Sequence, residues 1–143
     1  MGLLTLTRRA DWPERLAEVV ATATDKPYVL GRWDCLRFAC ACIEAMTGTD
    51  FWPRFAGSYK THREALRAII LVARDLPTAI GNTLGVPPVP TLLAHRGDLV
   101  LYRDPAGEHI GVCLGATVAV LGPDGLLHLP LTHDGLGPAW RIG

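Results

Sequence analysis

The spacing of hydrophobic residues changes partway along this chain, and this change is the strongest constraint on its fold. Up to about residue 84, apolar residues recur every three to four positions, as on one face of a helix. From Gly97 onwards they alternate with other residues, as in strands that have one buried face. Helical segments followed by strands, rather than alternating with them, predict an α+β fold.

The first two helices have clear starts in the sequence. Asp11 followed by Glu14 is a capping-box pattern, so the first helix is expected to begin at Asp11. The second helix is expected to run from about Cys35 to Thr47 and to stop at Gly48. Its residues are apolar on nearly all sides, which predicts that this helix lies buried at the centre of the fold.

Two more helical segments and four strands are expected after it. Thr61 and Glu64 form another capping-box pattern, which predicts a third helix reaching about Arg74. Residues 78–84 are expected to form a short helical turn. Strands are expected over residues 98–102, 108–114, 117–121 and 126–129, with strong turn sequences between them. Together these strands predict an antiparallel meander packed against the helices.

Length and charge limit what the chain can be. Its 143 residues, 1–143, are expected to form one domain with a core of its own. Lys plus Arg number 14, as do Asp plus Glu, so no net positive charge attracts nucleic acid. Basic pairs such as Arg8 and Arg9 are expected to be solvated surface. No segment is expected to span a membrane. No signal peptide is expected either, so the chain is expected to be synthesised in the cytoplasm.

Cys35 differs from the other cysteines by its position. A turn at Gly31 leads to Asp34, which can cap a helix whose first residue is Cys35. A thiol at that position faces unpaired N–H groups and the positive end of the helix dipole, and both stabilise the thiolate. The sequence therefore predicts a reactive thiol at Cys35. The other cysteines are expected to be small buried groups: Cys40, Cys42 and Cys113.

His109 is the candidate base for such a thiol. It opens a predicted strand in which His109, Gly111 and Cys113 share one face. The glycine is expected to leave room on that face for the end of a neighbouring helix. A cysteine at a helix start with a histidine on a packed strand is an arrangement for nucleophilic acyl transfer. Asp98 is interpreted as a structural turn residue, and no role is assigned to His62, His95 and His133.

Three short segments resemble the NlpC-type family of papain-like cell-wall cysteine peptidases. They are Pro27-Tyr28-Val29-Leu30-Gly31 followed by Asp34-Cys35, then Gly97-Asp98-Leu99-Val100, and then His109-Ile110-Gly111-Val112 followed by Leu114-Gly115. Nearly the whole chain also resembles a set of short phage and prophage tail proteins related to these peptidases. The shared features there are Trp33-Asp34-Cys35, Ala45-Met46-Thr47-Gly48, Gly57 with Tyr59, and Ala139-Trp140-Arg141.

This resemblance implies a papain-like fold, in which the helix that starts at Cys35 packs on a C-terminal antiparallel sheet or half-barrel. Cys35 would be the nucleophile, His109 the general base, and Tyr28 a hydroxyl close to the thiol. The substrate would be amide bonds of peptidoglycan stem peptides, with no metal or cofactor. At the tip of a virion tail, the chain would contact other tail-tip and baseplate proteins.

The sequence departs from the family at the position of the third catalytic residue. The family orients its histidine with a polar residue on the following strand, where this chain has only apolar residues at 118–121. His128, on the strand after that, is one candidate substitute, and an ordinary surface histidine is the alternative. Leu36 replaces the family's small polar residue after Asp-Cys, which predicts a closed approach to the thiol.

Three interpretations of function remain open at this point. The first is a tail-borne peptidoglycan endopeptidase that uses Cys35 and His109. The second is a catalytically weak or inactive structural component of the tail tip, a plug or hub contact, that keeps the same fold. The third is a thiol-dependent acyltransferase on that fold, which requires an apolar acyl channel.

Overall fold

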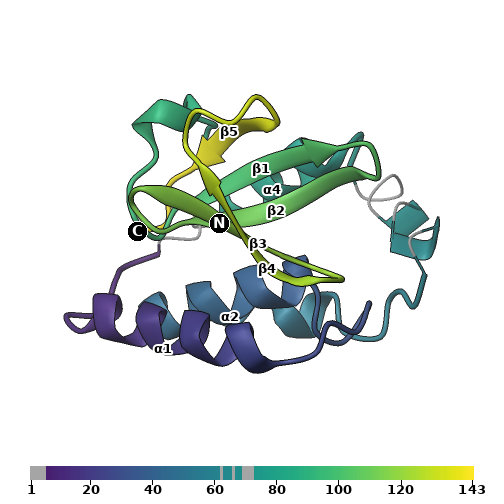
Figure 1. Cartoon of the computed structure of the whole chain (residues 1–143), viewed down its shortest axis with the longest axis horizontal. Helices are drawn as coiled ribbons and strands as arrows, with labels where there is room; N and C mark the ends of the chain where they lie inside the picture. The colour runs from purple at the N-terminus through teal and green to yellow at the C-terminus, as the bar shows by residue number, and fades with distance from the viewer. Residues whose placement is uncertain (1–5, 62, 66, 69–72) are drawn as a thin grey trace.

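Helices occupy the first part of the chain and strands the second, so the predicted α+β class is confirmed (Figure 1). The computed structural model describes residues 6–61, 63–65, 67–68 and 73–143. Two long helices, α1 and α2, lie side by side on one face of a five-stranded antiparallel sheet (Figure 1). Within the described ranges, no helix combines the length and the apolar character needed to cross a bilayer.

Helix α1 (Trp12–Asp25) begins where the sequence predicts, but the predicted capping box does not form. Asp11 has φ −98° and ψ 25°, whereas a capping residue normally has an extended backbone. Its Oδ2 accepts a hydrogen bond from Nε of Arg15 at 2.8 Å instead of one from a backbone N–H of the first turn. The side chain of Asp11 therefore forms a surface ion pair rather than a helix cap.

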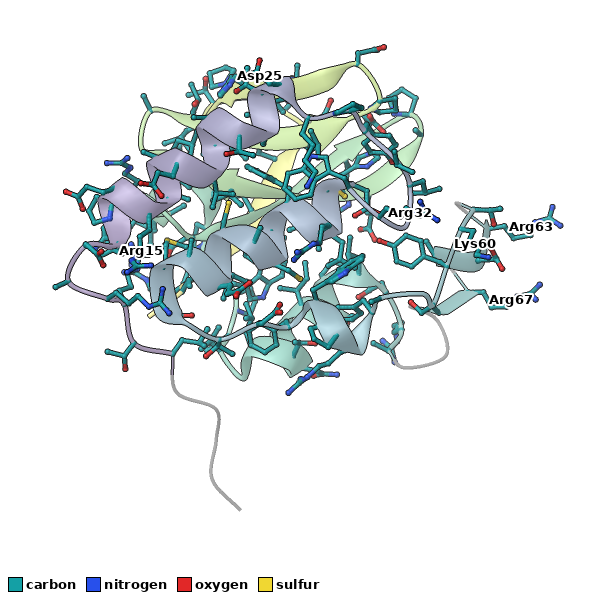
Figure 2. The ribbon with its side chains drawn as sticks, turned by 90° about the horizontal axis from the view of Figure 1, so that it is seen from below. Arg15, Asp25, Arg32, Lys60, Arg63 and Arg67 are labelled. Carbon is teal, nitrogen blue, oxygen red and sulfur yellow. The ribbon has the colours of Figure 1, made fainter. Side chains whose placement is uncertain are left out.

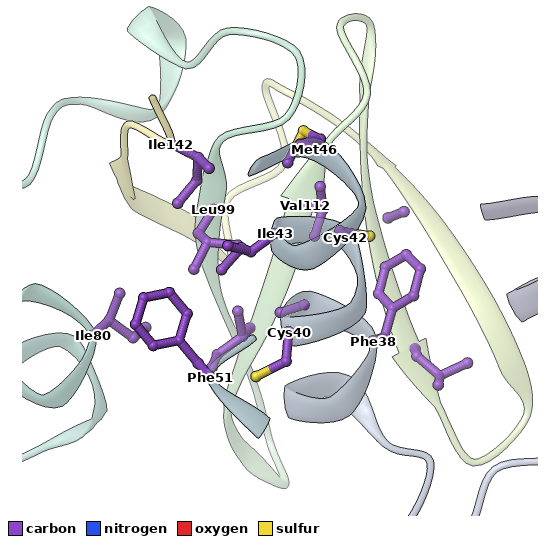
Figure 3. Close-up of a cluster of buried hydrophobic side chains, with 14 of the residues drawn as sticks. Phe38, Cys40, Cys42, Ile43, Met46, Phe51, Ile80, Leu99, Val112 and Ile142 are labelled. Atoms are coloured by element: carbon purple, nitrogen blue, oxygen red, sulfur yellow. The ribbon is translucent and has the colours of Figure 1, made fainter. Parts of the chain in front are cut away.

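Helix α2 (Cys35–Thr47) lies at the centre of the fold, as its apolar composition predicts. The side chain of Asp34 caps its first turn, and Gly48 ends it with a left-handed φ of 84°. Its buried side chains meet residues of the sheet and of the following loop in one core (Figure 3). The buried residues of α2 are Phe38, Ala39, Cys40, Cys42, Ile43 and Met46.

The predicted third helix lies partly outside the described residues, which exclude positions 62, 66 and 69–72. Residues 63–65 and 67–68 are helical, and Thr61 Oγ1 accepts the backbone N–H of Glu64 at 3.1 Å, as the predicted cap requires. Where a short turn was predicted, a nine-residue helix forms, α4 (Leu76–Leu84). Two short 3-10 helices complete this part of the chain, η1 (Trp52–Arg54) and η2 (Thr91–Leu93).

The sheet contains the four predicted strands and a fifth that the sequence did not predict. The strands are β1 (Leu99–Asp104), β2 (Gly107–Cys113), β3 (Thr117–Gly122), β4 (Gly125–Pro130) and β5 (Leu136–Trp140). Their order is β4-β3-β2-β1-β5, so the first four form the predicted meander and β5 returns to the free edge of β1. The sequence of β5 includes Gly137 and Pro138. Glycine and proline are depleted in strands, and for this reason the sequence did not predict β5.

Alternation along the strands gives the sheet two buried faces. One face packs against the helices in the main core. The opposite face carries a smaller apolar cluster, here called the second cluster, which consists of Val100, Cys113, Val118, Val120, Leu129 and Ala139. Because side chains alternate along β2, His109 and Gly111 share the face of Cys113, as predicted.

Arg8 is not the solvated residue that the sequence predicted. Its Nε donates to the carbonyl of Ile142 at 2.6 Å, its Nη1 to the carbonyl of Arg96 at 2.6 Å, and its Nη2 to Asp98 Oδ1 at 3.1 Å. Asp98, which is 1% exposed, also accepts the backbone N–H groups of His95 and Ile142. Asp98 is therefore a structural residue, as predicted, and with Arg8 it joins both ends of the chain to the turn before β1.

Candidate functional site

The buried carboxylate of Asp34 positions the start of α2. Its Oδ1 accepts the backbone N–H of Arg37 at 2.9 Å, and its Oδ2 accepts that of Gly31, also at 2.9 Å. The hydroxyl of Tyr59 donates to the same Oδ2. One carboxylate therefore holds the preceding turn, the first turn of the helix and the loop beyond it, and this fixes the position of Cys35.

Cys35 packs near the point where the ladder between β2 and β3 ends. The ladder between these strands has only two pairs, Val112 with Ala119 and Cys113 with Val118. Residues 107–111, the start of β2, consequently have no ladder partner on the β3 side. The half-buried Cys35 packs against the second cluster, on the sheet face opposite the main core.

The backbone N–H of Ile110 points toward the β3 side, where the ladder gives it no strand partner. The N–H of Cys113 donates toward the β1 side, to the carbonyl of Asp98, at 2.8 Å. Backbone N–H directions alternate along a strand, so the N–H of Ile110, three residues earlier, points away from β1. It acts on the sulfur of Cys35 and lowers the pKa of that thiol. The sulfur thus lies next to the backbone of the residue that follows His109.

The thiol of Cys35 is nevertheless protonated at neutral pH. Burial raises its pKa to about 11, and the carboxylate of Asp34 acts in the same direction. The N–H groups of Ile110, Leu36 and Cys35 itself lower the pKa and offset only part of this effect. The N–H groups at the helix start favour the thiolate, as the sequence predicts, but the loss of solvent outweighs them.

His109 is held by Asp104. Nε2 of His109 and Oδ1 of Asp104 are 2.8 Å apart, and their side chains are 23% and 29% exposed. The hydrogen bond from His109 is the main reason that the pKa of Asp104 lies below its ordinary value. Since an ionised carboxylate only accepts hydrogen bonds, the proton of the imidazole is on Nε2. Nδ1 is then the basic nitrogen.

Asp104 was not predicted, because it lies on the strand before His109, whereas the family's third polar residue lies on the strand after the histidine. The turn at residues 105–106 was recognised, and it pairs Asp104 with Gly107. The next pair on the same face is Tyr102 with His109, so Asp104 and His109 are diagonal neighbours on that face. Counting residues across this hairpin would have identified the contact.

Two tyrosines border the thiol and the imidazole. Burial raises the pKa of Tyr28 to about 12, with Cys35 and Asp34 as further causes, so a protonated phenol lies near the thiol. The ring of Tyr102 lies beside His109, with 5.8 Å between the ring centroids. Tyr102 and Cys35 both pack against the second cluster, whereas Tyr28 packs against the main core.

The structure does not bring His128 to His109. His128 is exposed on β4, where it pairs with Ala119 of β3. Ala119 in turn pairs with Val112 of β2, so a whole strand separates the two histidines. Val112 is three positions from His109 along β2, so the two side chains point to opposite faces of the sheet. His128, which is in register with Val112, is therefore on the face opposite His109. Asp104 is therefore the residue that contacts His109.

Gly111 serves a different purpose from the one predicted. A Cβ at this position would lie 2.6 Å from Cγ1 of Val118 and 2.9 Å from Cγ2 of Val120. The space beside Gly111 is therefore occupied by side chains of β3 and not by the end of a helix. The absence of a side chain at Gly111 therefore allows β3 to pack closely against β2 at this position.

The remaining cysteines are buried free thiols, as predicted. Cys40, Cys42 and Cys113 are each at most 3% exposed, and burial raises the pKa of Cys40 to about 12. Among the described residues, no three histidine, cysteine or acidic side chains lie close enough together to hold a metal ion.

Comparison with known proteins places the chain in a family. None of the curated proteins matches this sequence. A family model, described as a domain of unknown function (DUF6950), matches residues 7–142. This range includes Asp34, Cys35, Asp104 and His109, together with every strand of the sheet. The chain therefore belongs to the DUF6950 family.

Proposed function

We propose that this chain is a papain-like cysteine peptidase of the NlpC type, carried at the tail tip of a phage or phage-like particle. It cleaves amide bonds of peptidoglycan stem peptides during penetration of the cell wall. One observation carries the proposal: a carboxylate-bound histidine, His109, directly precedes the residue whose backbone N–H acts on the sulfur of Cys35. A helix that begins at its cysteine and packs against an antiparallel sheet supports the papain-like fold.

The reaction begins with a protonated thiol. Nδ1 of His109 accepts the proton as the sulfur of Cys35 attacks the carbonyl carbon of the amide. Because the pKa of the thiol is about 11, proton transfer accompanies the attack, and no thiolate–imidazolium pair exists beforehand. The backbone N–H groups of Cys35 and Ile110 stabilise the negative charge that develops on the carbonyl oxygen.

The same histidine completes the cycle. The imidazolium of His109 gives its proton to the leaving amine, the C–N bond breaks, and a thioester to Cys35 remains. Water then attacks the thioester with His109 as the base, which releases a carboxylic acid and restores the thiol. Asp104 keeps Nε2 protonated throughout, so Nδ1 stays available for both proton transfers.

A second candidate function is a structural component of the tail tip with little or no activity. Two observations favour it. The thiol is half-buried with a raised pKa, and the exposed apolar side chains of Leu92 and Leu93 on η2 offer a contact to other tail-tip and baseplate proteins. Leu92 is 70% exposed and Leu93 is 54% exposed.

Hydrolysis of soluble stem peptides by the purified chain distinguishes the two functions. We expect cleaved products and a trapped thioester on Cys35, both observed by mass spectrometry. Cys35→Ser is expected to lower turnover by on the order of 10³-fold or more. Cys40→Ala, at a buried cysteine with no assigned role, is the matched control and should retain activity. Equal turnover by wild type and Cys35→Ser would contradict the peptidase proposal, and so would the absence of both product and thioester. Either result would favour the structural function.

A further inference from the structure

A pocket of about 310 Å³ lies at the far end of α2 from Cys35. Its lining, here called the basic pocket, consists of Arg8, Trp12, His95, Arg96, Asp98, Arg141 and Gly143. Met46 lies next to it, since a Cβ on Gly97 would be 2.7 Å from the sulfur of Met46. At about 1.5 Å per residue, Met46 is roughly 16 Å along the helix from Cys35. The basic pocket is therefore separate from the candidate active site.

Positive charge exceeds negative charge in this pocket. Three arginines face one acidic side chain, Asp98, which is already bound by Arg8 and by backbone N–H groups. The guanidinium of Arg96 makes no hydrogen bond or ion pair with any described residue and lies 5.9 Å from the ring of Trp12. Within the described chain, the arginines of this pocket form no ion pair other than that between Arg8 and Asp98. Two of the three arginines, Arg96 and Arg141, therefore have no ion-pair partner among the described residues.

The contact between Arg141 and His95 determines which hydrogen-bonding groups the basic pocket presents to a ligand. Nη1 of Arg141 lies 2.9 Å from Nδ1 of His95. A guanidinium cannot accept a hydrogen bond, so Nδ1 of His95 is the acceptor and the proton of the imidazole is on Nε2. The remaining nitrogen atoms of both side chains are hydrogen-bond donors. Arg96 adds further donors, so these three exposed side chains have only donors left to offer.

We propose that the basic pocket binds an oxyanion, the phosphate or carboxylate group of a ligand. The guanidinium groups of Arg96 and Arg141 bind it through charge-assisted, paired hydrogen bonds, and Nε2 of His95 donates another. The half-buried indole of Trp12 lines the same pocket, with the guanidinium of Arg8 4.2 Å from its ring centroid, and its Nε1–H group can report binding. Since this pocket shares no residue with the pair of Cys35 and His109, the inference does not depend on the proposed peptidase activity.

The test is a titration of the full, isotopically labelled chain, followed by NMR of the arginine Nε–H and tryptophan Nε1–H groups. The probes are inorganic phosphate in one series and succinate in the other, at constant ionic strength maintained with chloride. We expect saturable shifts at Arg96, Arg141 and Trp12 with at least one probe. The probe that binds more tightly identifies phosphate or carboxylate as the preferred group.

Variants make the test decisive. The double variant Arg96→Ala with Arg141→Ala replaces the two arginines that have no ion pair with any described residue. It is expected to weaken binding at least about tenfold, since each substitution removes charge-assisted hydrogen bonds to the ligand. Lysines at the same positions should recover part of the affinity, because the charge returns without the planar fork. Arg63→Ala removes an exposed arginine that projects from a distant end of the molecule (Figure 2) and should bind like wild type. Shifts that never saturate, or equal affinity in wild type and the double variant, would overturn the proposal.

Discussion

Oδ1 of Asp104 lies 2.8 Å from Nε2 of His109, across the hairpin that joins β1 to β2. The same oxygen accepts the backbone N–H groups of Ala106 and Gly107, at 2.9 Å and 3.1 Å, within the turn. The carboxylate that closes the hairpin is therefore also the one that orients the imidazole. Any change to Asp104 alters both, so a test of its role has to preserve the turn.

Asp104→Asn preserves the acceptor oxygen for the turn but removes the negative charge. We expect the rate of alkylation of Cys35 and the hydrolysis of stem peptides to fall by at least tenfold, because a neutral amide does not stabilise the imidazolium that forms when Nδ1 accepts the proton. Nitrogen chemical shifts of His109 report the tautomer directly and should still show the proton on Nε2, so that any loss of rate is due to the lost charge. Glu108→Gln is the matched control, since Glu108 lies in the same hairpin but pairs with Arg103 at 3.0 Å. If both variants behave alike, Asp104 serves only the turn.

The raised pKa of Cys35 predicts how its reactivity changes with pH. Alkylation of Cys35 by a small reagent, located by mass spectrometry, should rise with pH toward a midpoint near the pKa of about 11. A rate that is already at its plateau near neutral pH would show a preformed thiolate and contradict the mechanism. In His109→Ala, the alkylation rate at neutral pH should fall.

The same pKa shift predicts an effect on stability, whose sign follows from burial. The folded-state pKa of about 11 lies above the ordinary value of 9.0, so burial of the neutral thiol stabilises the fold below about pH 9. That contribution is lost as the pH rises from about 9 through 11. Denaturation of wild type and of Cys35→Ser, compared across this range, should show a steeper loss of stability in wild type. Parallel pH profiles would contradict a buried, neutral thiol.

Asp98→Ala should be among the most destabilising single substitutions in the chain. It leaves Arg8, half-buried, without its carboxylate and leaves the backbone N–H groups of His95 and Ile142 without an acceptor. Breaking a buried ion pair in this way costs about 3–5 kcal/mol. Asp11→Ala removes the exposed pair with Arg15 and should cost less than about 1 kcal/mol. Chemical denaturation measures both, and similar losses would refute a structural role for Asp98.

Tyr59→Phe tests how the loop after α2 supports the nucleophile. The substitution removes the hydroxyl that donates to the buried Asp34, at a cost of about 1–3 kcal/mol. The turn before Cys35 should become more mobile, seen as faster amide hydrogen exchange at Gly31. Tyr102→Phe is the control, because no described residue hydrogen-bonds to the hydroxyl of Tyr102. Unchanged exchange at Gly31 in Tyr59→Phe would contradict this role.

Gly31→Ala tests whether close approach, and not only backbone conformation, requires glycine in this turn. Gly31 has φ 83°, and a Cβ there would collide with the carbonyl oxygen of Tyr59. Gly57 has a similar φ of 77° but no atom within 4 Å of the same position. Both alanine variants carry left-handed strain of about 1–2 kcal/mol, and only Gly31→Ala also meets the collision. A clearly larger loss of stability is therefore expected for Gly31→Ala, measured by thermal denaturation, and equal losses would contradict it.

Local chemistry explains why much of the architecture could be predicted from the sequence. The cap at Asp34, the left-handed stop at Gly48 and the alternation through His109 each depend on residues a few positions apart. Such short-range patterns predicted α2 within its observed bounds and the order of the first four strands. The cap predicted at Asp11 does not form, because the backbone of Asp11 is not in the extended conformation that capping requires.

Long-range contacts decided the remainder. Strand β5 forms because its edge pairs with β1, although its own residues disfavour a strand. Arg8 becomes a structural residue only because Ile142 and Asp98, far along the chain, receive its donors. The sequence by itself determined where the helices and the first strands begin and which residues share a face, since these follow from local hydrogen bonding and spacing. Only the tertiary structure decided the protonation of Cys35, because the desolvation that raises its pKa comes from the elements that cover it.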